Sequence, residues 1–428
     1  MNSAAKLAIN GGTPARRKPF PAYNTIGDEE KRAVAEVLDT GVLSKFLGTW
    51  SEEFFGGPRV QKLERDWENL FGVKHAVSVN SATSGLIAAV GAAGIGPGDE
   101  VIVSPYTMSA SATCVLFYGA VPVFADIEPE TFCISAESIE PHISSRTKAI
   151  IVVDLFGQPA SMRPIMELAR NRGLIVIEDA AQAPGAKYFG QFAGTLADIG
   201  VFSLNRHKII HTGEGGVNVT NDSGFAERMQ LIRNHGEAVV KEKGVANIVN
   251  LLGFNFRMTE IEAAIGCEQL KKLPALLAKR QQVCQQLSQM LAEIPGVIPP
   301  TVRHGATHAY YLFPVRYDEN ELGVPRKIFC DALRAEGIPI YEGYVEPLYL
   351  APLYQQRIAL GKNGYPFANS TVSYQKGICP IAERMHEREL FILGMCHSHL
   401  NREDLDDVVS GIRKVTQCRD ELRSAAWA

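Results

Sequence analysis

A single lysine stands between two apolar stretches in "VFSLNRHKIIHTGEGGVNVTND" (201–222). Lysine side chains are rarely fully buried unless they are paired, so Lys208 is either solvated in a surface loop or used in chemistry. The glycines that follow allow a tight turn or a close approach to a ligand. An amine held there can form a Schiff base with an aldehyde, and Ser203, five residues earlier, offers a phosphate contact.

A carboxylate follows another apolar stretch in "IEDAAQAPGA" (177–186), where Asp179 is the candidate. Burying an unpaired carboxylate costs free energy, so Asp179 needs a positive partner. A protonated heterocyclic nitrogen is one such partner. The alternative is that Asp179 only caps a helix.

A third candidate is "SVNSATSG" (78–85), in which an apolar stretch leads through small residues into a helix. The free N–H groups at a helix start, with serine and threonine hydroxyls, form a cradle for an anion such as phosphate. The alternative is that Ser81 or Thr83 is an ordinary N-cap.

The fourth candidate is "GFNFRMTEIEAAIG" (253–266), where Asn255 and Arg257 precede a helix. Thr259 and Glu262 have the spacing of a capping box, which is the simpler interpretation of this segment. Taken together, the four segments supply a phosphate cradle, a carboxylate for a ring nitrogen and an imine-forming lysine. Pyridoxal phosphate requires these parts of a protein, so it is the cofactor that we expect, with no metal.

The elements that must position these residues are strands rich in valine and isoleucine, separated by amphipathic segments such as 161–173. Strands without polar alternation are buried on both faces, which is typical of α/β proteins with a largely parallel sheet. Ligands bind such sheets at the carboxyl ends of the strands. The predicted strands lie at 75–79, 100–105, 121–127, 149–157, 174–180, 198–204 and 215–221. The last two are joined by too short a segment for a helical crossover, so one of them is expected to run antiparallel.

The pattern changes after a long helix predicted from Met258 to about Leu291, with a break near Pro274. Beyond it we expect a strand in 308–318 and helices at 326–337 and 402–415, which is an α+β arrangement. We therefore predict a large cofactor-binding α/β domain with an N-terminal arm over residues 1–290. A smaller α+β domain is predicted over residues 291–428.

Composition excludes several classes of partner. The chain has 43 basic and 47 acidic residues among 428 and a net charge of −4, without a concentrated basic surface for nucleic acid or an anionic membrane. It contains no secretory signal and no apolar stretch of the ~18 residues that span a bilayer. The eight cysteines are scattered without a C-x-x-C pair, so we expect reduced thiols and a soluble cytoplasmic protein.

These segments resemble the DegT/DnrJ/EryC1/StrS family of sugar aminotransferases, within the fold type of aspartate aminotransferase. The resemblance runs from about residue 7 to the terminal helix. It is carried by "NSATSGL", "PYTMSASA", "GAVPVFADIEPETF", "IEDAAQAPGA", "FSLNRHK", "TGEGG" and "GFNFRMTEIEAAIG". It implies that Lys208 forms the Schiff base, that Asp179 pairs with the pyridinium nitrogen and that Gln182 lies near the ring hydroxyl. It also implies that the cofactor phosphate is surrounded by Ala82, Thr83 and Ser203.

The resemblance further implies a homodimer with shared active sites, because Asn255 would reach the phosphate bound by the partner subunit. One departure concerns the ring that stacks on the cofactor in relatives. Here that position is Met108, whose thioether packs more loosely, with Tyr106 as the alternative. Some family members carry histidine in place of the lysine and act as dehydratases. Here His207 is adjacent, but Lys208 occupies the Schiff-base position.

We therefore expect a ping-pong transamination from glutamate or glutamine to a keto-sugar, linked to a nucleotide, or to a keto-cyclitol. Such a reaction belongs to amino-sugar, polysaccharide or antibiotic biosynthesis. A sugar dehydratase that uses the same cofactor is the alternative, and a cofactor-binding regulator without turnover is a second one. A nicotinamide enzyme does not fit, because the Gly-rich segment 91–103 precedes a strand and does not open a helix.

Two further segments have no assigned role. Residues 43–57 carry Phe46, Trp50, Phe54 and Phe55 and are either a lid over the acceptor or a loop packed on the partner subunit. Two interpretations apply to the second segment: its residues either contact a sugar or pack in a core strand. They are His304, His308, Tyr310 and Tyr311.

Overall fold

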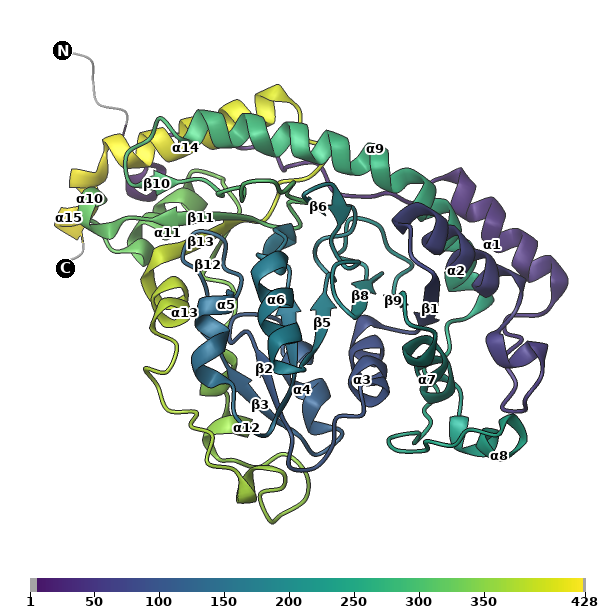
Figure 1. The fold of residues 1–428 in the computed structure, drawn as a ribbon. Helices are drawn as coiled ribbons and strands as arrows, with labels where there is room; N and C mark the ends of the chain where they lie inside the picture. The colour runs from purple at the N-terminus through teal and green to yellow at the C-terminus, as the bar shows by residue number, and fades with distance from the viewer. Residues whose placement is uncertain (1–5, 426–428) are drawn as a thin grey trace.

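Seven strands form one mixed sheet in the computed structural model, which describes residues 6–425 (Figure 1). They are β1 (His75–Val79), β2 (Glu100–Val103), β3 (Val121–Phe124), β4 (Thr147–Val153), β5 (Ile175–Asp179), β8 (Ile199–Ser203) and β9 (Gly216–Thr220). Their order across the sheet is β1-β9-β8-β5-β4-β2-β3, and only β9 runs against its neighbours. All seven predicted strands are present, and the prediction that one strand next to Lys208 is antiparallel is confirmed.

Alternate residues of the strands face opposite helix layers. Phe202 and Val217 pack with helices α2 (Pro58–Phe71) and α9 (Glu260–Leu291) on one face. The side chain of Asn218, between the two valines of β9, donates to the Gly85 carbonyl of helix α3 (Ala82–Ala92) on the other face at 2.8 Å. The sheet is therefore covered on both sides, as the apolar strands predicted.

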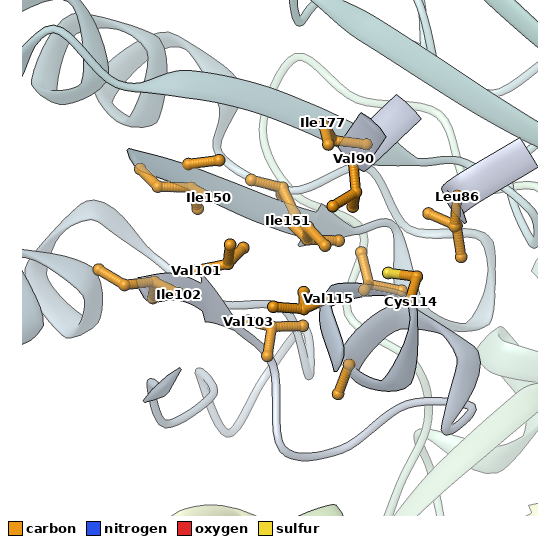
Figure 2. Packing of buried hydrophobic residues seen from close by; sticks show 14 of the residues in the cluster. Leu86, Val90, Val101, Ile102, Val103, Cys114, Val115, Ile150, Ile151 and Ile177 are labelled. Carbon is orange, nitrogen blue, oxygen red and sulfur yellow. The ribbon is translucent and has the colours of Figure 1, made fainter. Parts of the chain in front are cut away.

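The centre of the core lies between α3, the strands β2, β4 and β5, and helix α4 (Ala110–Leu116) (Figure 2). Figure 2 shows Val90 of α3 close to Ile151 and Ile177, and Leu86 of the same helix nearer to Cys114 of α4; all of these side chains are buried in one cluster. This packing fixes the start of α3 and the end of β5 relative to each other.

Helix α9 is a single helix of 32 residues, so the predicted break near Pro274 is wrong. Proline removes one backbone donor and crowds the preceding turn. Here Pro274 is exposed, whereas Leu270, Leu273 and Leu277 are buried against the rest of the chain. Packing on α2 and on helix α1 (Asp28–Thr40) therefore keeps the helix continuous. Figure 1 shows α9 extending from α1 and α2 to the C-terminal helices.

A second, antiparallel sheet follows α9, with the order β10-β11-β13-β12. Its strands are β10 (Val297–Ile298), β11 (Phe313–Tyr317), β12 (Ile340–Glu342) and β13 (Leu390–Leu393), and helices α11 (Arg326–Ala335) and α14 (Arg402–Gln417) pack beside it. Leu7 of the N-terminal arm belongs to this second core, whereas Tyr349 and Tyr374 pack in the core of the large sheet. The division at residue 290 stays a prediction.

The remaining elements are shorter or peripheral. They are α5 (Ala136–Ile139), α6 (Met162–Arg172), α7 (Ser223–Arg233), α8 (Val240–Lys243), α10 (Glu319–Leu322), α12 (Pro352–Gln355), α13 (Pro380–Arg384), α15 (Arg419–Ala425) and the hairpin β6 (Lys187–Tyr188) and β7 (Gln191–Phe192). Within residues 6–425, none of the helices combines the length and the apolar character needed to cross a membrane.

Candidate active site

Helix α3 begins directly after β1 and presents unused backbone donors. Ser81 is the N-cap, and its hydroxyl oxygen accepts the Ser84 amide at 3.0 Å. The amides of Ala82 and Thr83 lie in the first turn, where a helix offers no internal acceptor. A Cβ at Gly216 of β9 would lie 2.8 Å from the Ala82 nitrogen. The missing side chain therefore lets β9 pass beside a helix start that can bind an anion.

Asp179 is the last residue of β5 and is 5% exposed. One carboxylate oxygen accepts the Ser111 hydroxyl at 2.7 Å, and the other accepts the Ala181 amide at 3.2 Å. Burial raises the pKa of this carboxyl, while Ser111, Ala181 and the charge of Lys208 oppose the rise. A cation placed against Asp179 would relieve this desolvation and hold the acid ionised.

Lys208 lies in the short connection from β8 to β9. Its backbone amide donates to the Asn205 carbonyl at 2.8 Å, and the Arg206 amide donates to Gly213, whose φ of +91° favours glycine. The Lys208 nitrogen lies 4.2 Å from the centre of the Tyr311 ring. Burial lowers the pKa of the amine to about 8, with Asp179 acting in the opposite direction. Near neutral pH a useful fraction of Lys208 is therefore a neutral nucleophile.

One cavity of about 320 Å³ brings these residues together. Among the residues predicted for the site, those that line it are Ala82, Thr83, Met108, Asp179, Gln182, Ser203 and Lys208. Gln182 is held at both ends: its oxygen accepts the Phe156 amide at 2.7 Å and its nitrogen donates to the Tyr344 hydroxyl at 3.2 Å. The volume is in the range of small-molecule sites.

Met108 and Tyr106 have different places. Met108 lines the cavity and is 59% exposed, whereas Tyr106 is fully buried and lies outside the cavity lining. The Tyr106 hydroxyl accepts the Tyr344 amide at 2.9 Å. Of the two candidates, only Met108 is therefore placed to pack on a ligand in this cavity.

Asn255 is the one predicted site residue that does not line the cavity. It is exposed, and its side-chain oxygen accepts the Arg257 guanidinium at 2.7 Å. Its backbone carbonyl accepts the Asn80 side chain at 3.3 Å, just before α3. The capping box of Thr259 and Glu262 is present at the start of α9, as expected.

The two segments without an assigned role differ in whether they reach the cavity. Phe54 is buried among Trp50 and Phe55, and no residue of 43–57 lines the cavity. Tyr310 is buried in the second core, whereas its neighbour Tyr311 lines the cavity. Sequence reasoning missed two residues of the site. Ser111 stands in "PYTMSASA", a motif that was considered only for the side chain that stacks on the cofactor, and Tyr344 stands in no motif.

The residues of the cavity fit pyridoxal phosphate. The free amides of α3 and the Ser203 hydroxyl match a phosphate, Asp179 matches a protonated ring nitrogen and Lys208 matches an aldehyde. The described part of the chain holds no group of three or more metal-ligating side chains suited to a metal ion.

Comparisons with known proteins identify a family. A model of the DegT/DnrJ/EryC1/StrS aminotransferase family matches residues 24–413. The chain is 39% identical to GDP-perosamine synthase of Caulobacter vibrioides over 328 residues, which cover 76% of this chain and 84% of that protein. It is 32% identical to L-glutamine:2-deoxy-scyllo-inosose aminotransferase of Streptoalloteichus tenebrarius over 436 residues, with 98% and 99% of the two chains covered. The solved structure of an aminotransferase from Psychrobacter cryohalolentis matches with a TM-score of 0.81 and 30% identity, over 94% of this chain and 100% of that chain.

Proposed function

We propose, from the premise that this chain belongs to the DegT/DnrJ/EryC1/StrS aminotransferase family, that it transfers an amino group from glutamate or glutamine to a keto-sugar or a keto-cyclitol. As a member of the family it is a pyridoxal phosphate-dependent aminotransferase of fold type I. The observation that carries the proposal is the placement of Lys208 and Asp179 in one cavity with the free start of α3. The dehydratase alternative is not favoured, because the reactive position holds lysine.

Bound pyridoxal phosphate supplies an aldehyde that links to amines and a pyridinium ring that accepts the electron pair left when a proton is removed. Asp179 would keep the ring nitrogen protonated through its buried carboxylate. The amides of Ala82 and Thr83 and the Ser203 hydroxyl would hold the phosphate, also while the cofactor is not linked to the chain. Met108 would pack against the ring.

Lys208 has two roles in the proposed reaction. Its Nζ would hold the cofactor aldehyde until a donor amine takes that place. The released Nζ would take the proton from the donor α-carbon and deliver it to the former aldehyde carbon of the cofactor within the same half-reaction, and would carry a proton in the opposite direction in the second half-reaction, as a general base and acid. A pKa of about 8 suits this exchange near neutral pH.

The acceptor is proposed from relatives of two kinds. GDP-perosamine synthase is named for a nucleotide-linked sugar, and the Streptoalloteichus relative is named for a cyclitol and for L-glutamine as donor. We propose the same acceptor classes here, in the biosynthesis of amino sugars, polysaccharides or antibiotics.

The test is a transamination assay with purified protein and pyridoxal phosphate. Glutamate and glutamine are paired with nucleotide-linked keto-hexoses and keto-cyclitols, and the amino product is measured by mass spectrometry. Lys208→Ala should lower multiple-turnover rates by about 10³-fold or more, by removing the amine that holds the cofactor and carries the proton. Lys279→Ala, at an exposed position of α9, is the matched control. Full turnover by Lys208→Ala would refute the assignment, and activity restricted to simple keto acids would refute the acceptor class.

We also propose a homodimer in which Asn255 reaches the phosphate bound by the partner subunit. Asn255 is exposed, and its backbone forms an isolated antiparallel β-bridge with that of Asn234. The side chain of Asn234 donates to the Leu47 carbonyl at 2.8 Å. Leu47, Val249 and Leu252 are exposed apolar side chains of the same region, typical of a surface covered by a partner.

Mixed dimers test this proposal. A dimer of one Lys208→Ala chain and one Asn255→Ala chain contains one intact site only if Asn255 acts across the interface. Mixing and reassembling the two variants should then restore activity well above that of either variant alone. Activity no higher than the average of the two variants would contradict a shared site.

We propose a cytoplasmic location on chemical grounds. Seven cysteines are buried as thiols, among them Cys114, whose pKa is raised by burial. Buried thiols of this kind are typical of reducing compartments. Fractionation of the native host's cells would test this.

A further inference from the structure

The amine of Lys208 rests on an aromatic face. Its nitrogen lies 4.2 Å from the centre of the Tyr311 ring, and both residues line the cavity. A cation is attracted to the negative face of such a ring. The contact of Tyr311 with Lys208 is made by the face of its ring.

The backbone that carries the Tyr311 ring is held by hydrogen bonds. The guanidinium of Arg280 on α9 donates to the Tyr310 carbonyl at 2.9 Å and to the Tyr311 carbonyl at 3.4 Å. Tyr310 has a φ of +52° and is 2% exposed, packed in the second core. The next amide, of Leu312, donates to the Phe156 carbonyl at 3.4 Å. The backbone around Tyr311 is therefore attached to two other parts of the fold.

The backbone next to the lysine is held by Tyr23, whose ring lies against the same arginine. The hydroxyl of Tyr23, on the N-terminal arm, donates to the carbonyl of Ile209, the residue after Lys208, at 2.5 Å. The Arg280 guanidinium lies 4.8 Å from the Tyr23 ring. Arg280 is 4% exposed and has no ion pair with any carboxylate of the described chain. A buried cation without an acid is costly, so its bonds to these carbonyls and its ring contact are what hold it.

We propose that Tyr311 is a positioning residue for Lys208: its ring face holds the amine while the amine is not linked to the cofactor. The proposal rests on the proposed role of Lys208. In this role the ring, and not bulk water, contacts the released amine. The amine therefore stays within the cavity, beside the substrate carbon. Arg280 and Tyr23 act indirectly: Arg280 holds the backbone of Tyr311, and Tyr23 holds the backbone next to the lysine.

A fluorinated series at position 311 isolates the ring face. Phenylalanine, 4-fluorophenylalanine and 3,5-difluorophenylalanine are incorporated there in the full chain, since fluorine weakens cation binding by the ring at nearly constant shape. Lys208 labelling by an amine-reactive reagent is then followed by peptide mass spectrometry as a function of pH, in cofactor-free full-length protein. Only the neutral amine reacts, so the pH of half-labelling reports how well the charged amine is held.

The expected result is a stepwise fall in the pH of half-labelling, by about 0.5–1 in total across the series, with Tyr311→Phe close to the unmodified protein. Lys279 in the same digests should not change. A flat series, or a shift already complete in Tyr311→Phe, would overturn the proposal. Borohydride trapping of the loaded enzyme separately reports whether the cofactor is linked to Lys208. Failure there would refute the proposed function, whereas a flat series with correct trapping would refute only the role of Tyr311.

Discussion

Replacing Asp154 by asparagine should make the protein more stable, and increasingly so as pH rises. Asp154 directly follows β4, Glu178 lies within β5, and both side chains are fully buried. One oxygen of Asp154 accepts the Ala160 amide at 2.9 Å, and one oxygen of Glu178 accepts the Leu196 amide at 2.9 Å. The other oxygen of each side chain is buried without a donor from the described residues. A proton shared between these two oxygens would satisfy both.

We infer that Asp154 carries the shared proton. Burial raises the pKa of Asp154, and the neighbouring Glu178 raises it further. Burial also raises the pKa of Glu178, but backbone amides and the Asp154 hydrogen bond oppose that rise. Because the folded pKa of Asp154 exceeds the unfolded one, folding takes up a proton. The stability from this group is full below the unfolded pKa of about 4 and is lost as pH rises toward the folded pKa.

The variant Asp154→Asn should keep both hydrogen bonds without a titrating proton. Its amide oxygen can accept from Ala160, and its amide nitrogen can donate to Glu178 at any pH. Each pH unit in which wild-type Asp154 stays protonated costs about 1.4 kcal/mol relative to the variant. With an unfolding entropy of about 0.9 kcal/mol/K for a chain of 428 residues, the difference in Tm should grow by about 1.5 °C per pH unit.

The assay is thermal unfolding of the loaded enzyme at matched protein and cofactor concentrations, from pH 5.5 to pH 8.5. Asp39→Asn, at an exposed position of α1, controls for the loss of one acidic residue. Asp154→Ala should be less stable than wild type by about 1–3 kcal/mol at low pH, because it leaves Glu178 without its donor. A difference between Asp154→Asn and wild type that stays constant over this pH range would refute the shared proton.

Three further predictions concern the cavity. Asp179→Asn should lower kcat by about 10²–10⁴-fold, because the amide cannot hold the ring nitrogen protonated; in the transamination assay, activity within tenfold of wild type would contradict this. In cofactor-free protein the rate of cofactor uptake should rise with pH and level off above about 8, as Lys208 loses its proton; a rate independent of pH between 6.5 and 9.5 would oppose it. Gly216→Ala should weaken cofactor binding about tenfold or more, about 1.4 kcal/mol, because its Cβ would lie 2.8 Å from the Ala82 nitrogen; absorbance titration measures this, with Gly48→Ala, whose Cβ would meet nothing within 4 Å, as the control.

The acid and the amine were predictable because both follow strands that the sequence marks clearly. β5 begins with the apolar residues Ile175–Ile177, and β8 is apolar up to Phe202, so the position at which each strand ends could be identified without knowledge of packing. The carboxyl ends of neighbouring parallel strands meet at one edge of a sheet. Asp179 and Lys208 are therefore brought together by features that are local in sequence.

The break expected in α9 failed for the opposite reason. The local rule for Pro274 is sound for an isolated helix, but the buried leucines on either side are held by helices far away in the sequence. The choice between Met108 and Tyr106 was similarly open, because positions two residues apart in one segment face different surroundings. The Tyr106 hydroxyl accepts a hydrogen bond from the Tyr344 amide. Tyr344 comes from a segment with no pattern that links it to this site.

The C-terminal wall of the cavity therefore depends on how the two cores are joined, and not on any motif. Tyr311 and Tyr344 belong to the part of the chain beyond α9, yet they contact Lys208 and Gln182. Their positions are set by Arg280 and by the Tyr106 hydroxyl, two buried groups that reach across from the helix and from the large sheet. A motif can specify the residues that carry out chemistry on the cofactor, since strand ends place them. The residues that hold the released amine and close the cavity follow only from packing, because their contacts join segments that the sequence shows as unrelated.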